Sequence, residues 1–412
     1  MEQADKQPRA GYFQRYRGLP PTVFALSSVS FLNDTSSDII YPLLPAFLAL
    51  TLGASPFAIG LIEGFAESVA SILKLFSGYL SDKFGRRKLP VFLGYSLAAV
   101  VRPLLAFVTS WQQVLVVRMT DRIGKGIRGA PRDALLAASV PKEKRGLVFG
   151  FNRAADHLGA VAGPVIAYFL LTWLAENPDN PTAREYQNVF LFASIPVAIG
   201  LLIIVGFVRE DPKVQVNGET MPIKFSLAAF DGNFKRFLAI VSLFTLSNST
   251  DAFLLLRAKE AGIAAAMLPL IWMALHFSKF FSSIIGGDLS DKVGRKLLIF
   301  TGWVIYALVY AGFAFAHAAW QIWALFIIYG LYFGLTEGVE KALVADLVDD
   351  EKRGTAYGFY NLAFGITVFP ASLLFGLIWN QFGSASAFLI SASVSIVAAL
   401  LLLTVNQHKQ PA

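Results

Sequence analysis

The stretch GYLSDKFGRRK at residues 78–88 returns later in the chain as GDLSDKVGRK at residues 287–296, which is 209 positions further on. A second pair lies 208 positions apart, because EKRGLVFGF at 143–151 matches EKRGTAYGF at 351–359. Both matches occur in the same order and at nearly the same separation. Such internal similarity indicates that the chain consists of two related halves.

Both halves are strongly apolar. Hydrophobic residues make up 55% of the chain and charged residues only 15%, whereas about a quarter of the residues in a soluble protein are charged. Apolar stretches long enough to cross a bilayer recur throughout the sequence. Two parallel repeats of six spans with a site between them are typical of rocking transporters. The sequence therefore predicts an all-α integral membrane protein with 12 transmembrane helices in two pseudo-symmetric six-helix bundles, the spans lying at about 22–50, 57–80, 89–109, 112–138, 146–174, 188–208, 236–257, 265–289, 297–316, 319–346, 354–379 and 385–405.

Basic residues concentrate in alternate loops. In one set of loops Arg184, Arg257 and Lys259 are the only basic residues, while the other set carries several each. Because basic loops stay in the cytoplasm, we expect both termini to be cytoplasmic. No cleavable signal peptide precedes the first span, and we expect a multi-pass protein of the bacterial inner membrane. The expected parts are a cytoplasmic N-terminal segment (1–21), a first bundle (22–208), a cytoplasmic linker compatible with an amphipathic helix (209–235), a second bundle (236–406) and a cytoplasmic tail (407–412).

Composition excludes several classes of function. The chain has no cysteine, which excludes disulfides, thiolate metal sites and cysteine nucleophiles. The net charge of +7 does not indicate nucleic-acid binding, because the basic residues lie mostly between apolar spans. No nucleophile–base pattern is present, and we expect neither an enzyme nor a cofactor.

The repeated loop resembles a known family. GYLSDKFGRRK fits the motif G-x-L-x-D-K/R-x-G-R-R/K found between spans 2 and 3 of the major facilitator superfamily, and its copy after span 8 fits as well. The resemblance implies that these residues join cytoplasmic charge clusters that latch one conformation, with Asp133 at the inner end of span 4 as a candidate partner. The implied gating residues of the two loops are Gly78, Asp82, Gly85, Arg86, Asp291, Gly294 and Arg295.

Span 4 carries an unusual row of charges. On a helix they occupy an arc of about 140°, and the opposite face is apolar. A charge inside a membrane is costly and marks a functional cavity or a charge pair. For Arg118, Arg122 and Lys125 a cavity role competes with a structural pairing to Asp121. Arg128, Arg132 and Asp133 lie near the cytoplasmic end of the span and are compatible with a solvated helix end. The row consists of Arg118, Asp121, Arg122, Lys125, Arg128, Arg132 and Asp133.

Two further stretches resemble superfamily patterns. RIGKGIRGA at 122–130 is similar to R-x-x-Q-G-x-G-x-A of span 4, in which the family assigns the arginine to proton coupling, but Lys125 and Arg128 replace the glutamine and one glycine. In span 5, Gly150, Gly159 and Gly163-Pro164 have the spacing of the antiporter pattern, without its final glycine pair. The resemblance implies that Gly159, Gly163 and Pro164 act in gating, and simple helix packing is the alternative.

Other ionisable residues lie inside spans. A buried carboxylate can carry a proton near neutral pH, and fixed charge pairs are the competing interpretation. Each span that holds a histidine holds only one, which favours proton or hydrogen-bond partners over metal ligands. We expect no metal site. The candidate proton-coupling residues are Asp34, Asp38, Glu63, Glu67, Asp121, Asp156, His157 and Asp251.

The candidate cavity at mid-depth is richer in positive than in negative groups, and arginine is suited to bind carboxylate or phosphate. The candidate substrate-binding residues are Arg118, Arg122, Lys125, Arg153, His276, Lys279, Tyr41 and Trp272. We expect a monomeric secondary transporter that works by alternating access and exchanges protons for a small organic anion or amphipathic compound, with export favoured. Proton-linked uptake of an organic anion or metal chelate is an alternative. A membrane sensor or scaffold that does not transport is another.

Overall fold

The computed structural model describes residues 18–84, 87–141, 144–209, 226–349 and 352–406, and these residues form helices without strands. The first half contains α1 (Pro21–Ile40), α2 (Leu44–Ala46), η2 (Phe47–Thr51), α3 (Pro56–Phe84), α4 (Lys88–Val101), η3 (Arg102–Phe107), α5 (Trp111–Ala138), α6 (Arg145–Leu174), α7 (Ala183–Phe192) and α8 (Ser194–Phe207). The second half contains η5 (Leu227–Ala229), α9 (Gly232–Ser247), α10 (Ala252–Glu260), η6 (Ala265–Met267), α11 (Leu268–Val293), α12 (Arg295–Phe315), α13 (Ala319–Asp346), α14 (Arg353–Phe382) and α15 (Ser384–Leu402).

The helical segments follow one another in the predicted order. In the described part of the chain, ten are long and apolar enough to cross a membrane. Two further segments contain polar residues that lower their hydropathy. They are the segment that begins with α1 and the charge-bearing helix α5. The predicted all-α membrane fold is therefore confirmed.

Several spans are interrupted, which their apolar patterns do not reveal. The first span turns after α1, where Pro42 and Pro45 remove backbone donors, and continues through α2 and the π-helical η2. The third span tightens into a 3₁₀ helix at Pro103. The seventh span breaks at residues 248–250 between α9 and α10. Freed backbone groups are tolerated at membrane depth only where protein covers them. At this break Tyr306 donates to the carbonyl of Ser247 at 2.8 Å.

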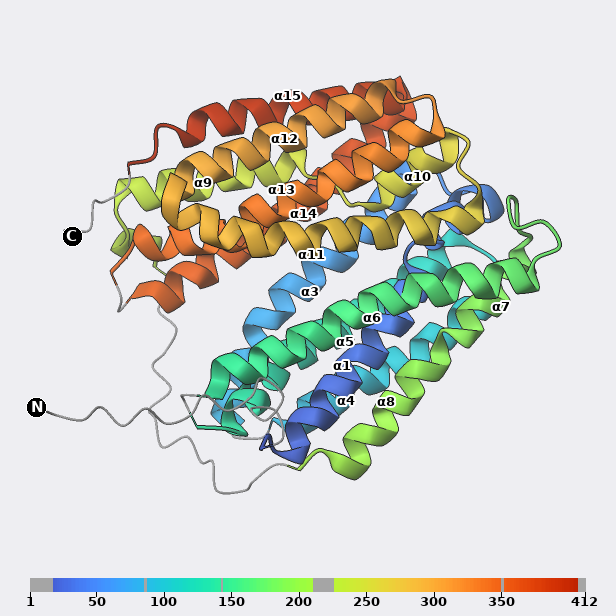
Figure 1. Cartoon of the computed structure of the whole chain (residues 1–412), viewed down its shortest axis with the longest axis horizontal. Helices are drawn as coiled ribbons and strands as arrows, with labels where there is room; N and C mark the ends of the chain where they lie inside the picture. The colour runs from blue at the N-terminus through green and yellow to red at the C-terminus, as the bar shows by residue number, and fades with distance from the viewer. Residues whose placement is uncertain (1–17, 85–86, 142–143, 210–225, 350–351, 407–412) are drawn as a thin grey trace, which may run out of the picture.

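The two halves lie side by side and diverge toward one end of the molecule. Figure 1 shows them closest where α7 and α10 lie, and farther apart toward the end where α1 begins and α15 ends. At the closed end the backbone amides of Ala265 and Ala266 donate to the carbonyls of Asp179 and Pro178, at 3.2 and 3.1 Å. Along their length the halves meet through two helix pairs, α3 with α14 and α6 with α11.

The internal repeat is visible in side-chain contacts. Arg87 donates to the carbonyl of Ala134, and Arg295, 208 positions later, donates to the carbonyl of Ala342. Arg145 contacts the carbonyl of Ala137, and Arg353 contacts that of Ala345, again 208 positions later. The two halves therefore place equivalent residues in equivalent surroundings.

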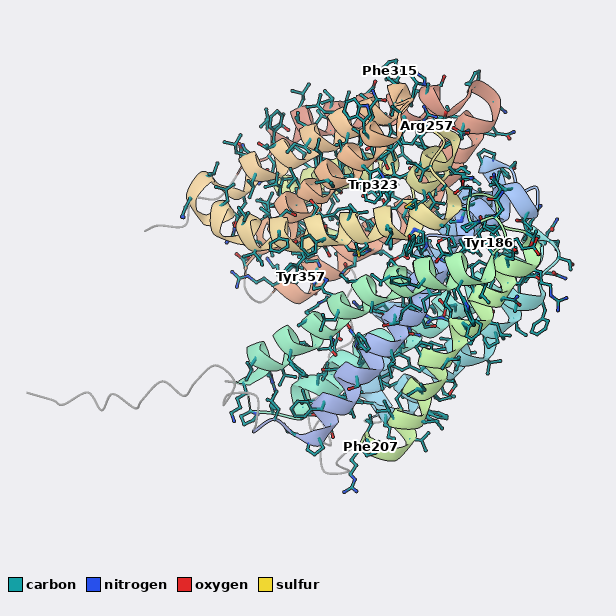
Figure 2. All side chains as sticks on the ribbon, turned by 45° about the vertical axis from the view of Figure 1, so that its right-hand side comes forward. Tyr186, Phe207, Arg257, Phe315, Trp323 and Tyr357 are labelled. Carbon is teal, nitrogen blue, oxygen red and sulfur yellow. The ribbon has the colours of Figure 1, made fainter. Side chains whose placement is uncertain are left out.

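The outer surface is apolar. Phe207 and Phe315 are 65% and 63% exposed, and Figure 2 shows them on the outer sides of the two halves. Trp173, Leu202 and Trp320 are exposed to at least 71%. Such a surface is suited to lipid contact. Of the predicted amphipathic linker helix, residues 210–225 lie outside the described residues, residues 227–229 form only a 3₁₀ turn, and α9 already begins at Gly232, capped by Asp231.

Candidate functional site

A buried ion pair joins α3 and α5. Arg118 donates to both carboxylate oxygens of Glu63, at 2.8 and 2.5 Å, and the two side chains are only 5% and 6% exposed. The Arg118 guanidinium also lies 5.7 Å from the ring centre of Tyr41. A bidentate pair of this kind fixes both side chains. Glu63 is therefore the partner of Arg118, in place of Asp121.

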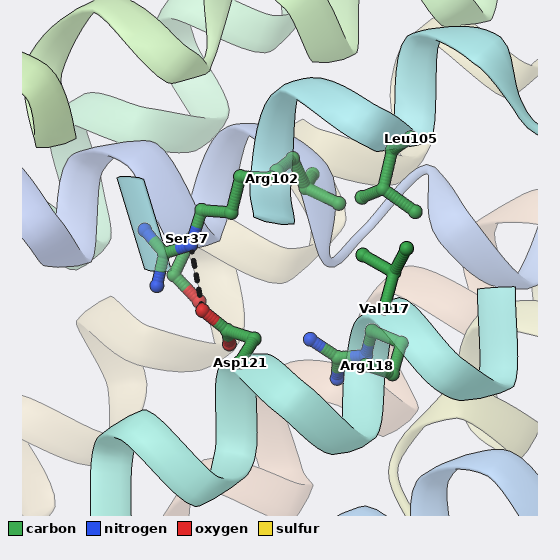
Figure 3. A pocket seen from close by; sticks show the side chains of 7 residues that line it. Ser37, Arg102, Leu105, Val117, Arg118 and Asp121 are labelled. Carbon is green, nitrogen blue, oxygen red and sulfur yellow. Dashed lines mark hydrogen bonds and ion pairs between the residues drawn. The ribbon is translucent and has the colours of Figure 1, made fainter. Parts of the chain in front are cut away.

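Asp121 is paired with Arg102, a residue that was not among the sequence-based candidates. Arg102, at the start of η3, donates to Asp121 at 2.9 Å and to the carbonyl of Asn33 at 3.0 Å. Figure 3 shows this pair beside a cavity of about 10 Å³ that Arg118 and Ser37 also line. That volume holds about one water molecule. An arginine inside an otherwise apolar span was the available signal.

Two cations share one carboxylate one turn further along the same helices. Arg122 Nε and Lys125 Nζ both lie 3.9 Å from oxygens of Glu67. Arg122 is 11% exposed and its Nε has no hydrogen-bond partner among the described residues, whereas Lys125 is 49% and Glu67 38% exposed. The charges of Arg122 and Lys125 act on the carboxyl group of Asp38. The charge of Glu67 acts on the carboxyl group of Asp251 in the second half. This cluster therefore faces the second half and carries more positive than negative charge.

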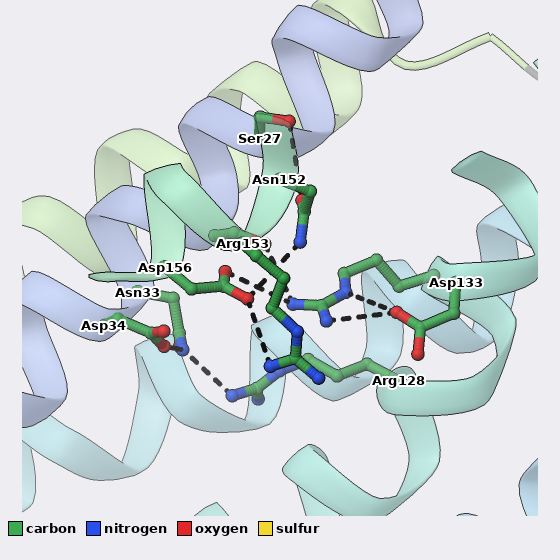
Figure 4. Close-up of polar contacts among 10 residues, drawn as sticks. Ser27, Asn33, Asp34, Arg128, Asp133, Asn152, Arg153 and Asp156 are labelled. Atoms are coloured by element: carbon green, nitrogen blue, oxygen red, sulfur yellow. Dashed lines mark hydrogen bonds and ion pairs between the residues drawn. The ribbon is translucent and has the colours of Figure 1, made fainter. Parts of the chain in front are cut away.

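The lower part of the α5 row is held by a network with α1 and α6. Arg132 contacts Asp133 at 3.1 Å and Asp156 at 3.8 Å, and Arg153 reaches the other oxygen of Asp156 at 3.8 Å (Figure 4). Arg153 is 70% exposed. Arg128 donates to Asn33, which in turn donates to Asp34. Asn33 thus links a cation to a carboxylate, a role that was not predicted from the sequence.

Side chains of α1 reach across to the second half. Trp272 Nε1 donates to a carboxylate oxygen of Asp38 at 2.9 Å, and the rings of Trp272 and Tyr41 lie 4.8 Å apart. The Tyr41 hydroxyl lies 3.5 Å from that of Thr250. Asp34 acts electrostatically on both Asp38 and Asp156. Asp38, Asp34 and Asp156 therefore form a row of carboxylates that leads from the α1–α11 contact to α6.

The remaining candidates of the second half are Asp251, which directly precedes α10, and His276 and Lys279 of α11. Lys279 pairs with Glu337 at 3.2 Å and lies 3.9 Å from the ring centre of Phe333. Asp251 accepts a hydrogen bond from Tyr329 at 2.8 Å. His276 packs edge-on against Trp272, and its Nε2 has no hydrogen-bond partner among the described residues. His157 of α6 packs against Phe280 of α11.

Only part of the implied latch lies among the described residues. Gly85 and Arg86 lie outside the described residues, as do the side chains of Asp82 and Asp291 and the surroundings of Gly78. Arg295 forms an ion pair with Asp346 at the end of α13. Gly294 joins α11 to α12 with a φ of +94°, a conformation that favours glycine.

The two glycines of span 5 pack against α1. A Cβ at Gly159 would lie 2.5 Å from the carbonyl oxygen of Phe31, and one at Gly163 would lie 2.7 Å from that of Thr35. Pro164 stands inside α6, which continues to Leu174. These residues therefore hold two helices of the same half in close contact, beside Asp34 and Asp38.

Comparison with known proteins places the chain among transporters. The profile of the Major Facilitator Superfamily matches residues 26–338 and 237–412. An uncharacterized MFS-type transporter of Methanocaldococcus jannaschii is 35% identical over 395 residues, which cover 94% of this chain and 95% of the relative. A multi-drug resistance efflux pump of Streptococcus pneumoniae is 24% identical and covers 87% and 89%. The crystal structure of a nucleoside transporter superposes with a TM-score of 0.78 at 15% identity, over 94% of this chain and all of that one.

Proposed function

Because the chain belongs to the major facilitator superfamily of membrane transporters, we propose that it exchanges protons for a small organic anion and exports the anion by alternating access. The proposal places it as a monomer in the inner membrane, with both termini cytoplasmic. Under that orientation the halves lie closest at the outer end and diverge toward the cytoplasm (Figure 1).

The observation that carries the anion assignment is the cluster of Arg122, Lys125 and Glu67. One carboxylate stands between two cations at 3.9 Å from each, so neither cation is closely paired. The N–H group at the buried Nε of Arg122 donates no hydrogen bond to any described residue. A bound carboxylate or phosphate would accept that hydrogen bond and compensate the excess positive charge. In contrast, Arg118 is already matched by Glu63 and contributes structure.

The proton assignment rests on Asp38 and its neighbours. Asp38 joins the halves through Trp272 and lies near the anion cluster. A hydrogen bond to a charged acceptor contributes about 1.5–3 kcal/mol and one to a neutral acceptor about 0.5–1.5 kcal/mol. Protonation of Asp38 would therefore weaken the contact that closes the outer end. Asp34 and Asp156 continue the row of carboxylates toward the open end.

The direction of transport rests on similarity. The efflux pump of Streptococcus pneumoniae aligns along most of this chain, and the span 5 spacing resembles the antiporter pattern. Both favour export over uptake.

The experiment is a substrate survey in proteoliposomes that contain a pH-sensitive dye. Organic anions, organic cations and neutral sugars are added one at a time. Proton movement in response to anions, and its loss in Arg122→Ala, is the expected result. Movement only in response to cations would make the α5 row structural and transfer substrate binding to Asp34, Asp38 and Glu67. Labelled-substrate uptake without proton movement would contradict proton coupling.

A further inference from the structure

The second half contains a buried carboxylate at the position that matches Arg132 of the first half. With the separation of 208 positions that the loop contacts share, Glu340 corresponds to Arg132, Trp303 to Tyr95 and Tyr360 to Asn152. In the first half this place holds a cation flanked by Asp133 and Asp156. In the second half this place holds a carboxyl group instead of a cation.

Glu340 is held by two neutral donors from neighbouring helices. Trp303 Nε1 of α12 donates to one carboxylate oxygen at 3.0 Å, and the Tyr360 hydroxyl of α14 lies 2.6 Å from the other. Glu340 is only 7% exposed, Trp303 is fully buried and Tyr360 is 9% exposed. The carboxyl group therefore lies inside the second bundle, between α12, α13 and α14.

The charged groups near Glu340 do not neutralise it. Glu337, one turn earlier on α13, is paired with Lys279 of α11. Lys341 is the next residue along α13 and its side chain is exposed. Two tyrosines also interact with Glu340, namely Tyr332, two turns earlier on α13, and Tyr360. Among the described residues no cation lies within ion-pair distance of Glu340, and an unpaired buried charge is costly.

We propose that Glu340 is a second proton-binding site of the transporter, which is protonated in this arrangement of the helices. The Tyr360 hydroxyl donates to the carboxylate oxygen that it faces. When this oxygen takes up the proton, the bond reverses and the carboxylic acid donates to the Tyr360 hydroxyl oxygen. A separation of 2.6 Å is usual for such an O–H···O bond. This inference rests on the proposed proton coupling and adds a site in the half that the carboxylate row of α1 and α6 does not reach.

Release of the proton follows from the position of Glu340. It lies six residues before Asp346, the last residue of α13, which is about 9 Å along the helix axis. Tyr360 belongs to α14, the helix that packs on α3 of the first half. When the halves rock, the contact between α14 and α3 changes; a shift of α14 relative to α13 then separates the Tyr360 hydroxyl from the carboxyl group, and the proton passes from the acid to water at the end where α13 ends.

Infrared difference spectroscopy of the purified protein tests the site directly. A pH titration of the wild type is expected to show a carboxylic-acid C=O band that is missing in Glu340→Gln and retained in the matched control Glu337→Gln. Tyr360→Phe removes one hydrogen bond and is expected to shift the frequency and the titration midpoint of that band. A spectrum of Glu340→Gln identical to that of the wild type would overturn the proposal. If Glu340→Gln does not fold, an unshifted band in Tyr360→Phe would overturn it instead.

Transport assays distinguish a failure of the Glu340 site from a failure of the proposed function. We expect Glu340→Gln to lose about tenfold or more of its proton-driven transport while it keeps substrate counterflow, which needs no net proton movement. Unchanged proton-driven transport in Glu340→Gln would overturn the role of Glu340 and leave the proposed antiport intact. If the wild-type protein binds a proton at Glu340 but moves no protons with its substrate, the proposed antiport is overturned. The proton-binding site at Glu340 then still stands.

Discussion

The indole of Trp272 donates a hydrogen bond to the carboxylate of Asp38 at 2.9 Å, and this bond joins α11 of one half to α1 of the other. It lies beside the ring contact between Trp272 and Tyr41. A polar contact across the halves has to break whenever the closed end opens. Asp38 can therefore connect its own protonation to the conformation of the transporter.

Trp272→Phe should open the closed end more often, because it keeps an aromatic ring but removes the donor. Loss of about 1.5 kcal/mol or more from the closed state corresponds to about a tenfold or larger change in the equilibrium. The chain has no cysteine, so Ala266→Cys, buried at the closed end, gives a single reactive group. Its labelling rate should rise about tenfold or more in Trp272→Phe and remain unchanged in Trp320→Phe, an exposed control on the outer surface.

Asp38→Asn should uncouple protons from substrate. The asparagine oxygen still accepts from Trp272 but only as a neutral acceptor, so the labelling rate of Ala266→Cys should rise, by less than in Trp272→Phe. Substrate counterflow should continue, and proton movement should fall by about tenfold or more. Retained proton coupling in Asp38→Asn would remove Asp38 from the proton route.

Arg122→Ala should abolish coupled transport while the protein still folds, because Arg122 has no close ion pair to lose. Thermal unfolding of the purified variant should match that of the wild type. Lys125→Ala should weaken the apparent affinity for the anion with a smaller loss of rate, since Lys125 is half exposed. Near-normal transport by Arg122→Ala would exclude this residue from the mechanism.

Arg118→Met should destabilise the protein by about 3–5 kcal/mol, because Glu63 would remain buried without its cation. The double variant Arg118→Met, Glu63→Met should recover most of that loss, since it leaves no unpaired charge. The measurement is the thermal unfolding temperature in detergent. Equal destabilisation by the single and the double variant would show that packing, and not the ion pair, is what the mutation removes.

Gly159→Ala should destabilise the contact between α1 and α6 by about 1–3 kcal/mol, because the added Cβ meets the backbone of Phe31. Gly150 belongs to the same span 5 spacing, but a Cβ there would meet nothing within 4 Å. Gly150→Ala is therefore the matched control and should leave stability unchanged or higher. Equal effects of the two substitutions on thermal unfolding would contradict the packing role of Gly159.

The sequence predicted the repeat and the order of the spans because both depend on patterns within the chain. It also placed Arg118, Arg122 and Lys125 on one face of α5. It did not predict that Glu63 pairs with Arg118, because the register between α3 and α5 depends on packing. The role of Arg102 was missed for the same reason, since its partner Asp121 belongs to another helix. The break at residues 248–250 was missed because no proline or glycine marks it.

The central claim is that anion and proton cross in opposite directions. The most direct measurement imposes a pH gradient across proteoliposomes and follows an external labelled anion that the substrate survey has identified. Antiport predicts that vesicles with an acidic lumen accumulate the anion as protons leave, and that a proton ionophore abolishes the accumulation. Accumulation in vesicles with an alkaline lumen, where anion and proton enter together, would contradict the account and establish uptake by symport.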